Sequence, residues 1–272
     1  MTDVTVIGLG SMGATIAKLF NDKGRKVTVW NRTSDKANAA SLAGVSIAPT
    51  AEAAIAASPL IVMCVYDYSA VQAILASPGV AKAISGKTLV QLTTGSPADA
   101  RASATWATTH GAAYLDGAIQ AAPSQMGMAD TPILISGDQA AFAQWKPLLE
   151  DLAGNCVNLG AKTEDAATMD LATLSYVYGA FVGFLHGALI AESENLDVAQ
   201  FGKLVSDISP SFGAFFAHEG RVIQSRDFRI TESPLLSCFL LSFVLRFLFR
   251  SPDIKPHRCE PSRQRCYMLL HC

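Results

Sequence analysis

Residues 4–13 read Val4-Thr5-Val6-Ile7-Gly8-Leu9-Gly10-Ser11-Met12-Gly13, a short apolar run followed by a G-x-G-x-x-G motif. This motif, placed after a strand and at the start of a helix, is typical of dinucleotide-binding domains. Gly8 would permit a tight turn, Gly10 the approach of a pyrophosphate, and Gly13 close helix packing, while free amides attract the anion. The alternative is a glycine-rich turn without a ligand. We expect cofactor contacts from Gly8, Leu9, Gly10, Ser11, Met12 and Gly13.

The end of the next apolar run indicates which dinucleotide binds. A site for NAD would place a carboxylate there, to accept hydrogen bonds from the ribose hydroxyls. This chain instead has Asn31, which carries no charge to repel a 2′-phosphate, followed by Arg32, Thr33 and Lys36. These residues favour NADP. The alternative is a solvated basic turn whose charge is partly offset by Asp35.

Further along the chain, short apolar runs alternate with Ala-rich stretches that favour helix, which is the pattern of β-α-β units around a mostly parallel sheet. We predict a Rossmann-type, doubly wound α/β domain over residues 1–162. The expected strands cover residues 4–8, 26–30, 60–65, 87–92, 113–116, 131–136 and 156–159. The expected helices cover residues 12–23, 34–42, 69–75, 97–110 and 138–149.

The pattern changes after Lys162, where residues 163–192 contain no proline and predict one long helix. We expect this helix to open a second, shortened all-α domain over residues 163–233. Residues 171–191 contain no Asp, Glu, Lys or Arg, so a membrane span must be weighed. The flanking charges are acidic, and small residues recur at every fourth position, which also suits closely packed helices of a soluble protein. We therefore favour a helix buried between domains or subunits.

The composition excludes several classes of protein. The 272 residues are 50% hydrophobic and 16% charged, with a net charge of −2, which argues against a disordered chain and against nucleic-acid binding. The N-terminus lacks a secretory signal pattern, so we expect a cytoplasmic protein whose Cys64 and Cys156 are reduced core residues. His186 and His218 have no neighbours at metal-ligand spacing, and we expect no metal site.

Four segments together resemble the imine reductases and fungal reductive aminases of the β-hydroxyacid dehydrogenase superfamily. They are residues 8–13, 29–33, 92–97 (Leu-Thr-Thr-Gly-Ser-Pro) and 114–119 (Tyr-Leu-Asp-Gly-Ala-Ile), and residues 170–174, 178–179 and 183–186 extend the match. The resemblance implies an NADPH domain, a helical domain, and a homodimer whose long helices cross and whose active sites form between subunits. Its implied substrate is a small imine, or a carbonyl compound with an amine.

The resemblance also implies catalytic roles. Asp170 stands where hydroxyacid dehydrogenases of the superfamily carry a catalytic Lys. A carboxylate would stabilise a cationic iminium nitrogen, whereas an ammonium would suit an alcohol or carbonyl oxygen. Tyr178 and Thr94, the latter often Asn in fungal relatives, would be further polar groups of the pocket. Apart from the resemblance, Val65 and Tyr66 lie where the loops of an α/β sheet line a crevice, so they would approach the nicotinamide side of the cofactor or serve as a plain loop. The alternative is that Asp170 caps or solvates the helix start and Tyr178 is core.

Two other functions stay open at this stage. One is a β-hydroxyacid or semialdehyde dehydrogenase of the same superfamily; the other is a catalytically silent NADP-binding protein. The second arises because residues 234–272 depart from the family, which continues with further helices, and we interpret them as an atypical, non-homologous tail. A C-terminal membrane anchor over residues 235–249 and a Cys/His metal knuckle are weaker interpretations of the same tail.

Overall fold

The structure is a computed structural model that describes residues 2–33 and 44–226. The helix expected over residues 34–42, the predicted cofactor contact Lys36 and the atypical tail lie outside the described residues. The chain divides into two compact units, Met1–Gly183 and Phe184–Cys272, and each is considered by itself below.

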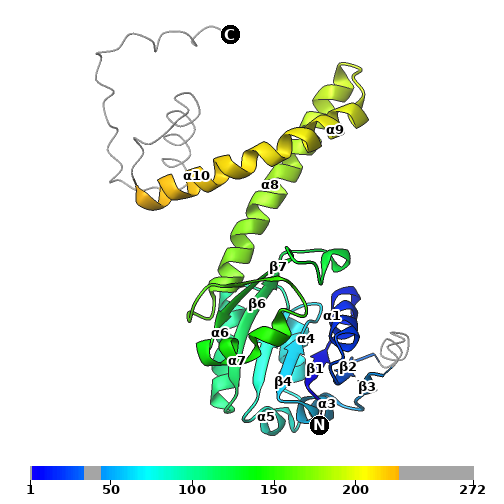
Figure 1. The fold of residues 1–272 in the computed structure, drawn as a ribbon, viewed down its shortest axis with the longest axis vertical. Coiled ribbons are helices and arrows are strands. Elements are labelled where there is room, and N and C mark those ends of the chain that lie inside the picture. Colours follow the sequence, from blue (N-terminus) through cyan, green and yellow to red (C-terminus); the bar gives the residue numbers. More distant parts are fainter. Residues whose placement is uncertain (1, 34–43, 227–272) are drawn as a thin grey trace. The chain divides into compact units, whose positions relative to one another are not determined.

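The first unit is built on an eight-stranded sheet with the order β3-β2-β1-β4-β5-β6-β7-β8 (Figure 1). Neighbouring strands are parallel except β6 and β7, which run antiparallel. The order 3-2-1-4-5-6 at its start is that of a Rossmann fold, so the predicted fold class is confirmed. The strands are β1 Val4–Ile7, β2 Val27–Trp30, β3 Ser46–Ile47, β4 Leu60–Met63, β5 Thr88–Gln91, β6 Ala113–Ile119, β7 Pro132–Gly137 and β8 Asn155–Asn158.

Two apolar clusters form the core, because successive side chains of a strand point to opposite faces of the sheet. Val4 and Val6 of β1 belong to one cluster with residues of α1 and α7. Ile7 belongs to the other, with residues of α3, α4, α5 and α6. The sheet is thus covered by helices on both faces, as a doubly wound fold requires. The helices are α1 Ser11–Asp22, α3 Ala51–Ala57, α4 Tyr68–Leu75, α5 Val80–Ala83, α6 Pro97–Thr109 and α7 Gln139–Leu149.

Three short elements were not expected from the sequence: β3, α3 and α5. β3 has two residues, both exposed, so no apolar alternation marks it. The start of α3 did carry a signal, because Thr50 caps it by accepting a hydrogen bond from the N–H of Ala53. β3 forms the edge of the sheet beside β2, α3 contacts β1 and β2, and α5 packs against α3.

Helix α8, Asp165–Ser193, matches the predicted long helix, but most of its apolar side chains after Asp170 are exposed rather than buried within the chain. By length and composition it is apolar enough to cross a membrane, with a mean hydropathy of 1.5, and 6% of its most apolar window is buried. Because this exposure is that of one chain by itself, the expectation of a helix buried between domains or subunits stays a prediction. The exposed large side chains are Met169, Leu171, Tyr176, Val177, Tyr178, Phe181, Val182, Leu185, Leu189 and Ile190.

The second unit contains the end of α8, followed by α9 Val198–Ile208, the short 3-10 turn η2 Ser209–Ser211 and α10 Phe212–Ser225. Phe201 of α9 stacks on Phe184 with ring centroids 5.3 Å apart. Gly187 makes this packing possible, since a Cβ there would lie 2.6 Å from the Phe201 ring. A helical second region is consistent with the predicted fold class.

Candidate active site

The glycine loop between β1 and α1 has the local geometry of a dinucleotide cradle. Gly8 adopts a φ of +97°, and a Cβ at this position would lie 2.1 Å from the carbonyl oxygen of Cys64. A Cβ on Gly13 would lie 2.0 Å from the carbonyl oxygen of Gly8. At Gly10, by contrast, a Cβ would meet no atom within 4 Å. The protein itself therefore requires glycine at the first and third positions, whereas the open space at the second suits a bound group.

The start of α1 is suited to an anion. Gly10 occupies the N-cap position, so no side chain caps the helix, and the first turn contains no acidic residue. Uncapped N–H groups and the positive end of the helix dipole attract phosphate. The residues at this loop thus fit the pyrophosphate of a dinucleotide.

The Asn31 side chain stabilises the glycine loop through hydrogen bonds, a role that the sequence did not predict. Its Oδ1 accepts a hydrogen bond of 3.0 Å from the N–H of Leu9, and its Nδ2 donates to the carbonyl oxygen of Thr33 at 3.0 Å. The side chain therefore ties the end of β2 to the glycine motif. It is also uncharged, which remains compatible with a 2′-phosphate nearby.

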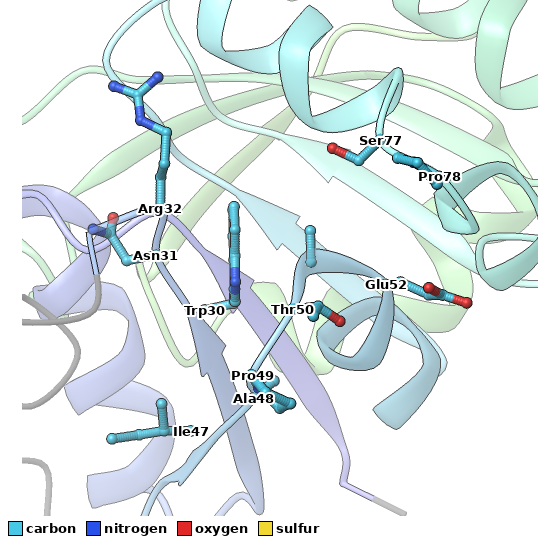
Figure 2. A pocket seen from close by; sticks show the side chains of 11 residues that line it. Trp30, Asn31, Arg32, Ile47, Ala48, Pro49, Thr50, Glu52, Ser77 and Pro78 are labelled. Atoms are coloured by element: carbon cyan, nitrogen blue, oxygen red, sulfur yellow. The ribbon is translucent and has the colours of Figure 1, made fainter.

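A pocket of about 500 Å³ lies beside the end of β2. Figure 2 shows its lining: Trp30, Asn31 and Arg32 come from the end of β2, Thr50 and Glu52 from the N-cap and first turn of α3, and further residues from the turn after α4. Among the described residues of this lining the charged ones are Arg32 and Glu52, and Arg32 and Thr33 are exposed. An exposed guanidinium next to the cradle offers planar, charged hydrogen bonds to a phosphate.

The turns after β4 and β5 bring Val65 and Thr94 to the same side of the sheet as the glycine loop, because β4 runs parallel to β1 and β5 runs parallel to β4. The N–H of Val65 donates to Thr93 Oγ1 at 3.0 Å, which joins the two turns. Thr94 is exposed and free of internal hydrogen bonds in the described structure. Asp67, in contrast, caps α4 by accepting a hydrogen bond of 2.8 Å from the N–H of Ala70.

Asp170 is buried, with 6% of its surface exposed, and its carboxylate contacts the residue that follows β6. Gln120 Nε2 donates to Asp170 Oδ1 at 2.6 Å. Thr173 Oγ1, less than one turn further along α8, lies 2.7 Å from Gln120 Oε1 and 2.9 Å from the backbone oxygen of Asp170. These three side chains form one hydrogen-bonded cluster that holds the carboxylate beside the end of β6.

The start of α8 is itself held by polar side chains of the sheet. Ser136 Oγ on β7 accepts from the N–H of Ala166 at 2.9 Å, and Asp116 Oδ2 on β6 accepts from the N–H of Ala167 at 3.1 Å. Because a helix start leaves several N–H groups without intrahelical partners, such acceptors stabilise it and fix its position. They also fix the place of Asp170, which belongs to the next turn.

Asp116 is an unusual acid, with 3% of its surface exposed. Burial raises its pKa from 3.8 to about 7; hydrogen bonds from Tyr114 and from the N–H of Ala167 oppose this rise, and the negative charge of Asp170 adds to it. Burial likewise raises the pKa of the Tyr114 hydroxyl well above its ordinary value, again with a contribution from Asp116. The base of α8 therefore contains two neighbouring carboxyl groups in different environments.

Tyr178 lies on α8 but is 63% exposed, and no hydrogen bond joins it or Thr94 to Asp170 within the described ranges. The structure thus brings Asp170 together with Gln120, Thr173 and Asp116, but not with the other two predicted catalytic residues. Gln120 was missed because nothing in its local sequence signals a contact across fifty positions. Asp116 belongs to the motif of residues 114–119, and a lone Asp inside an apolar strand is a signal that could have marked it as a site residue.

No group of three or more metal-ligating side chains occurs among residues 2–33 and 44–226. Cys64 and Cys156 are free thiols, and burial raises the pKa of each to about 11. A thiol with a raised pKa is a poor nucleophile at neutral pH. These cysteines belong with the packing of the sheet and not with the site chemistry.

Comparison with known proteins supports the assignment that this geometry suggests. Residues 3–160 match the family described as the NAD binding domain of 6-phosphogluconate dehydrogenase. Residues 163–239 match the C-terminal domain described as NADPH-dependent reductive aminase-like. An NADPH-dependent reductive aminase of Aspergillus oryzae is 35% identical over 202 residues, which cover 74% of this chain and 68% of that protein.

Solved structures give the same result. An imine reductase from Myxococcus stipitatus in complex with NADP+ superposes with a TM-score of 0.80 at 33% identity, covering 91% of this chain and 86% of that one. A reductive aminase from Aspergillus terreus in complex with NADPH4, cyclohexanone and allyl amine superposes with a TM-score of 0.75 at 35% identity, covering 90% and 85%. These relatives are NADP-dependent oxidoreductases. The chain therefore belongs to the family of NADPH-dependent reductive aminases and imine reductases.

Proposed function

We propose that the protein reduces imines or iminium ions with NADPH, including those formed from a carbonyl compound and an amine. The observation that carries this proposal is the buried Asp170 carboxylate, fixed at one oxygen by Gln120. A carboxylate held in a site of low polarity interacts strongly with a cation and weakly with a neutral carbonyl. A Lys at this position, as in the hydroxyacid dehydrogenases, would reverse that preference.

The residues of the first unit fit NADP. The glycine loop with Gly8, Gly10 and Gly13 would hold the pyrophosphate, and Arg32, with Thr33, would contact the 2′-phosphate. Val65 and Thr94 would border the nicotinamide, at the edge where the parallel strands end. When bound, the reduced nicotinamide supplies a hydride to the carbon of the C=N bond.

Asp170 and Tyr178 of α8 would act on the nitrogen of the substrate. Asp170 would stabilise the positive charge of the iminium ion before reduction and orient the C=N bond toward the cofactor. Tyr178 would assist proton delivery when the substrate is a neutral imine, because the product nitrogen must gain a proton that hydride transfer does not supply. Thr94 would provide a further hydrogen bond to the substrate or cofactor.

Spectrophotometric NADPH consumption tests this proposal. The purified full chain would be incubated with NADPH and a panel of cyclic imines and of ketone and amine pairs. In a parallel assay it would be incubated with NADP+ and 3-hydroxy acids. We expect turnover of cyclic imines and of at least some ketone and amine pairs, with none of the hydroxy acids. Oxidation of 3-hydroxy acids without imine reduction would contradict the proposal, and NADPH binding without any turnover would indicate a catalytically silent protein.

We also propose that the protein is a homodimer in which a second copy covers α8. Support comes from the resemblance and from the exposed apolar side chains of the helix, which are too many for a free surface. Gly179 and Gly183 of the same helix have open space where a Cβ would lie, so a partner helix could approach the backbone closely. In such a dimer the exposed Tyr178 would be covered.

Light scattering of the full chain tests the dimer. Val182 is 65% exposed, so Val182→Glu should abolish association while leaving the first unit intact. Met128→Glu, at an exposed position of the first unit, serves as the matched control and should remain dimeric. A wild-type monomer, or sedimentation of the wild type with lipid vesicles, would contradict the proposed second copy.

We also propose that the protein is cytoplasmic and that its cofactor-binding domain ends near residue 162.

A further inference from the structure

Gln120 is the least expected member of the Asp170 cluster. It follows β6 directly, and its backbone N–H donates to the carbonyl oxygen of Pro132 at 3.0 Å. This bond fixes the backbone from which the side chain reaches α8. Both ends of its amide group are then used, the nitrogen toward Asp170 and the oxygen toward Thr173. A carboxylate can only accept hydrogen bonds, so the amide has one possible orientation.

The second oxygen of Asp170 is left for another partner. Among the residues that the structure describes, His218 Nε2 is the one fully buried side-chain nitrogen or oxygen atom without a hydrogen-bond partner. Asp170 Oδ2 is not such an atom, so it is not fully buried. That oxygen accepts no hydrogen bond from the described residues. One carboxylate oxygen is thus held by the protein, and the other faces accessible space.

We propose that Gln120, locked by Thr173, is a positioning residue that holds the Asp170 carboxylate so that Oδ2 meets the substrate nitrogen. This inference rests on the proposed imine reduction. A neutral amide suits the task, because it fixes the rotamer without neutralising the charge. A Lys or Arg in its place would form an ion pair with Asp170 and compete with the cationic substrate.

Steady-state kinetics with a cyclic imine tests the inference. Gln120→Met keeps the length of the side chain and removes both hydrogen bonds; we expect kcat/KM for the imine to fall about 10-fold or more, with KM for NADPH unchanged. Thr173→Val should cause a smaller loss of about 3-fold, and Thr173→Ser should restore the wild-type value. Gln139→Met is the matched control. It removes an amide that donates to the carbonyl oxygen of Gly137, at the opposite end of β7 from the Pro132 that bonds Gln120, and it should leave the kinetics unchanged.

A double-mutant cycle separates positioning from a general structural effect. In an Asp170→Ala background, Gln120→Met should cause no further loss of kcat/KM, because its effect passes through that carboxylate. An equal loss in both backgrounds, or wild-type kinetics of Gln120→Met, would overturn the inference. If the wild type reduces no imine, the proposed function fails separately, and the same cycle measured on thermal unfolding decides the inference. Additive shifts in the unfolding midpoint would then overturn it.

Discussion

The buried acid Asp116 makes the stability of the protein depend on pH in a direction opposite to that of most carboxylates. Its pKa is raised by burial from 3.8 to about 7 in the folded protein. The folded state therefore keeps a proton that the unfolded state has already lost between these values. Because stability falls with rising pH wherever the folded state binds more protons, Asp116 should destabilise the protein progressively from about pH 4 to about pH 7.

The size of this effect follows from the same shift. One pKa unit corresponds to about 1.4 kcal/mol, so the rise to about 7 corresponds to roughly 4 kcal/mol over the full range. Between about pH 5 and about pH 7.5 the expected loss is roughly 2 to 3 kcal/mol. Asp116→Asn keeps an oxygen that can accept the N–H of Ala167 but cannot ionise, so this loss should disappear in the variant.

Urea unfolding of the wild type and Asp116→Asn at these two pH values measures the difference. The free energy of unfolding of the wild type should fall more steeply with pH than that of the variant, by the amount given above. Asp207→Asn, an exposed carboxylate of α9, is the control and should behave as the wild type. Parallel pH dependence of the wild type and Asp116→Asn would refute the assignment of a buried, neutral acid at the base of α8.

Three further outcomes follow from the cofactor loop and the helix start. Gly10→Ala should weaken NADPH binding in calorimetry and leave the thermal midpoint nearly unchanged, whereas Gly13→Ala should lower both, because its Cβ would lie 2.0 Å from the oxygen of Gly8. Arg32→Ala should reduce the preference for NADPH over NADH about 10-fold in kcat/KM, as expected for loss of one charged hydrogen bond; an unchanged ratio would contradict its phosphate role. Ser136→Ala should lower the stability by about 1 kcal/mol in urea unfolding, because the N–H of Ala166 loses its acceptor.

The sheet and its cofactor loop could be predicted from sequence, because their signals are local. The buried apolar run that contains Val4, Val6 and Ile7 is followed directly by the glycines, and this order predicts strand, turn and helix within ten residues. Short elements such as β3 carry too few residues to show a period, and they form because their neighbours provide an edge to pair with. The long helix was also predictable, but its exposure was not, since the sequence shows only that its side chains are apolar.

The candidate site was predictable only in part. Asp170 could be named from the resemblance, but its contact with Gln120 depends on how the end of β6 meets α8 in space. The hydrogen bond between Asn31 and Leu9 depends likewise on the ends of β1 and β2 lying side by side. Side-chain contacts between distant segments follow from the packing of whole elements, which no local pattern encodes.

The central claim concerns the charge of Asp170, and kcat/KM of Asp170→Asn on a cyclic imine at saturating NADPH tests it most directly. A carboxylate about 4 Å from a cation contributes about 4 kcal/mol at an effective dielectric constant near 20. We therefore predict a loss of about 100-fold to 1000-fold in Asp170→Asn, with NADPH affinity retained, while Asp165→Asn on the same helix stays close to the wild type. Equal turnover of the cyclic imine by the wild type and Asp170→Asn would contradict the claim.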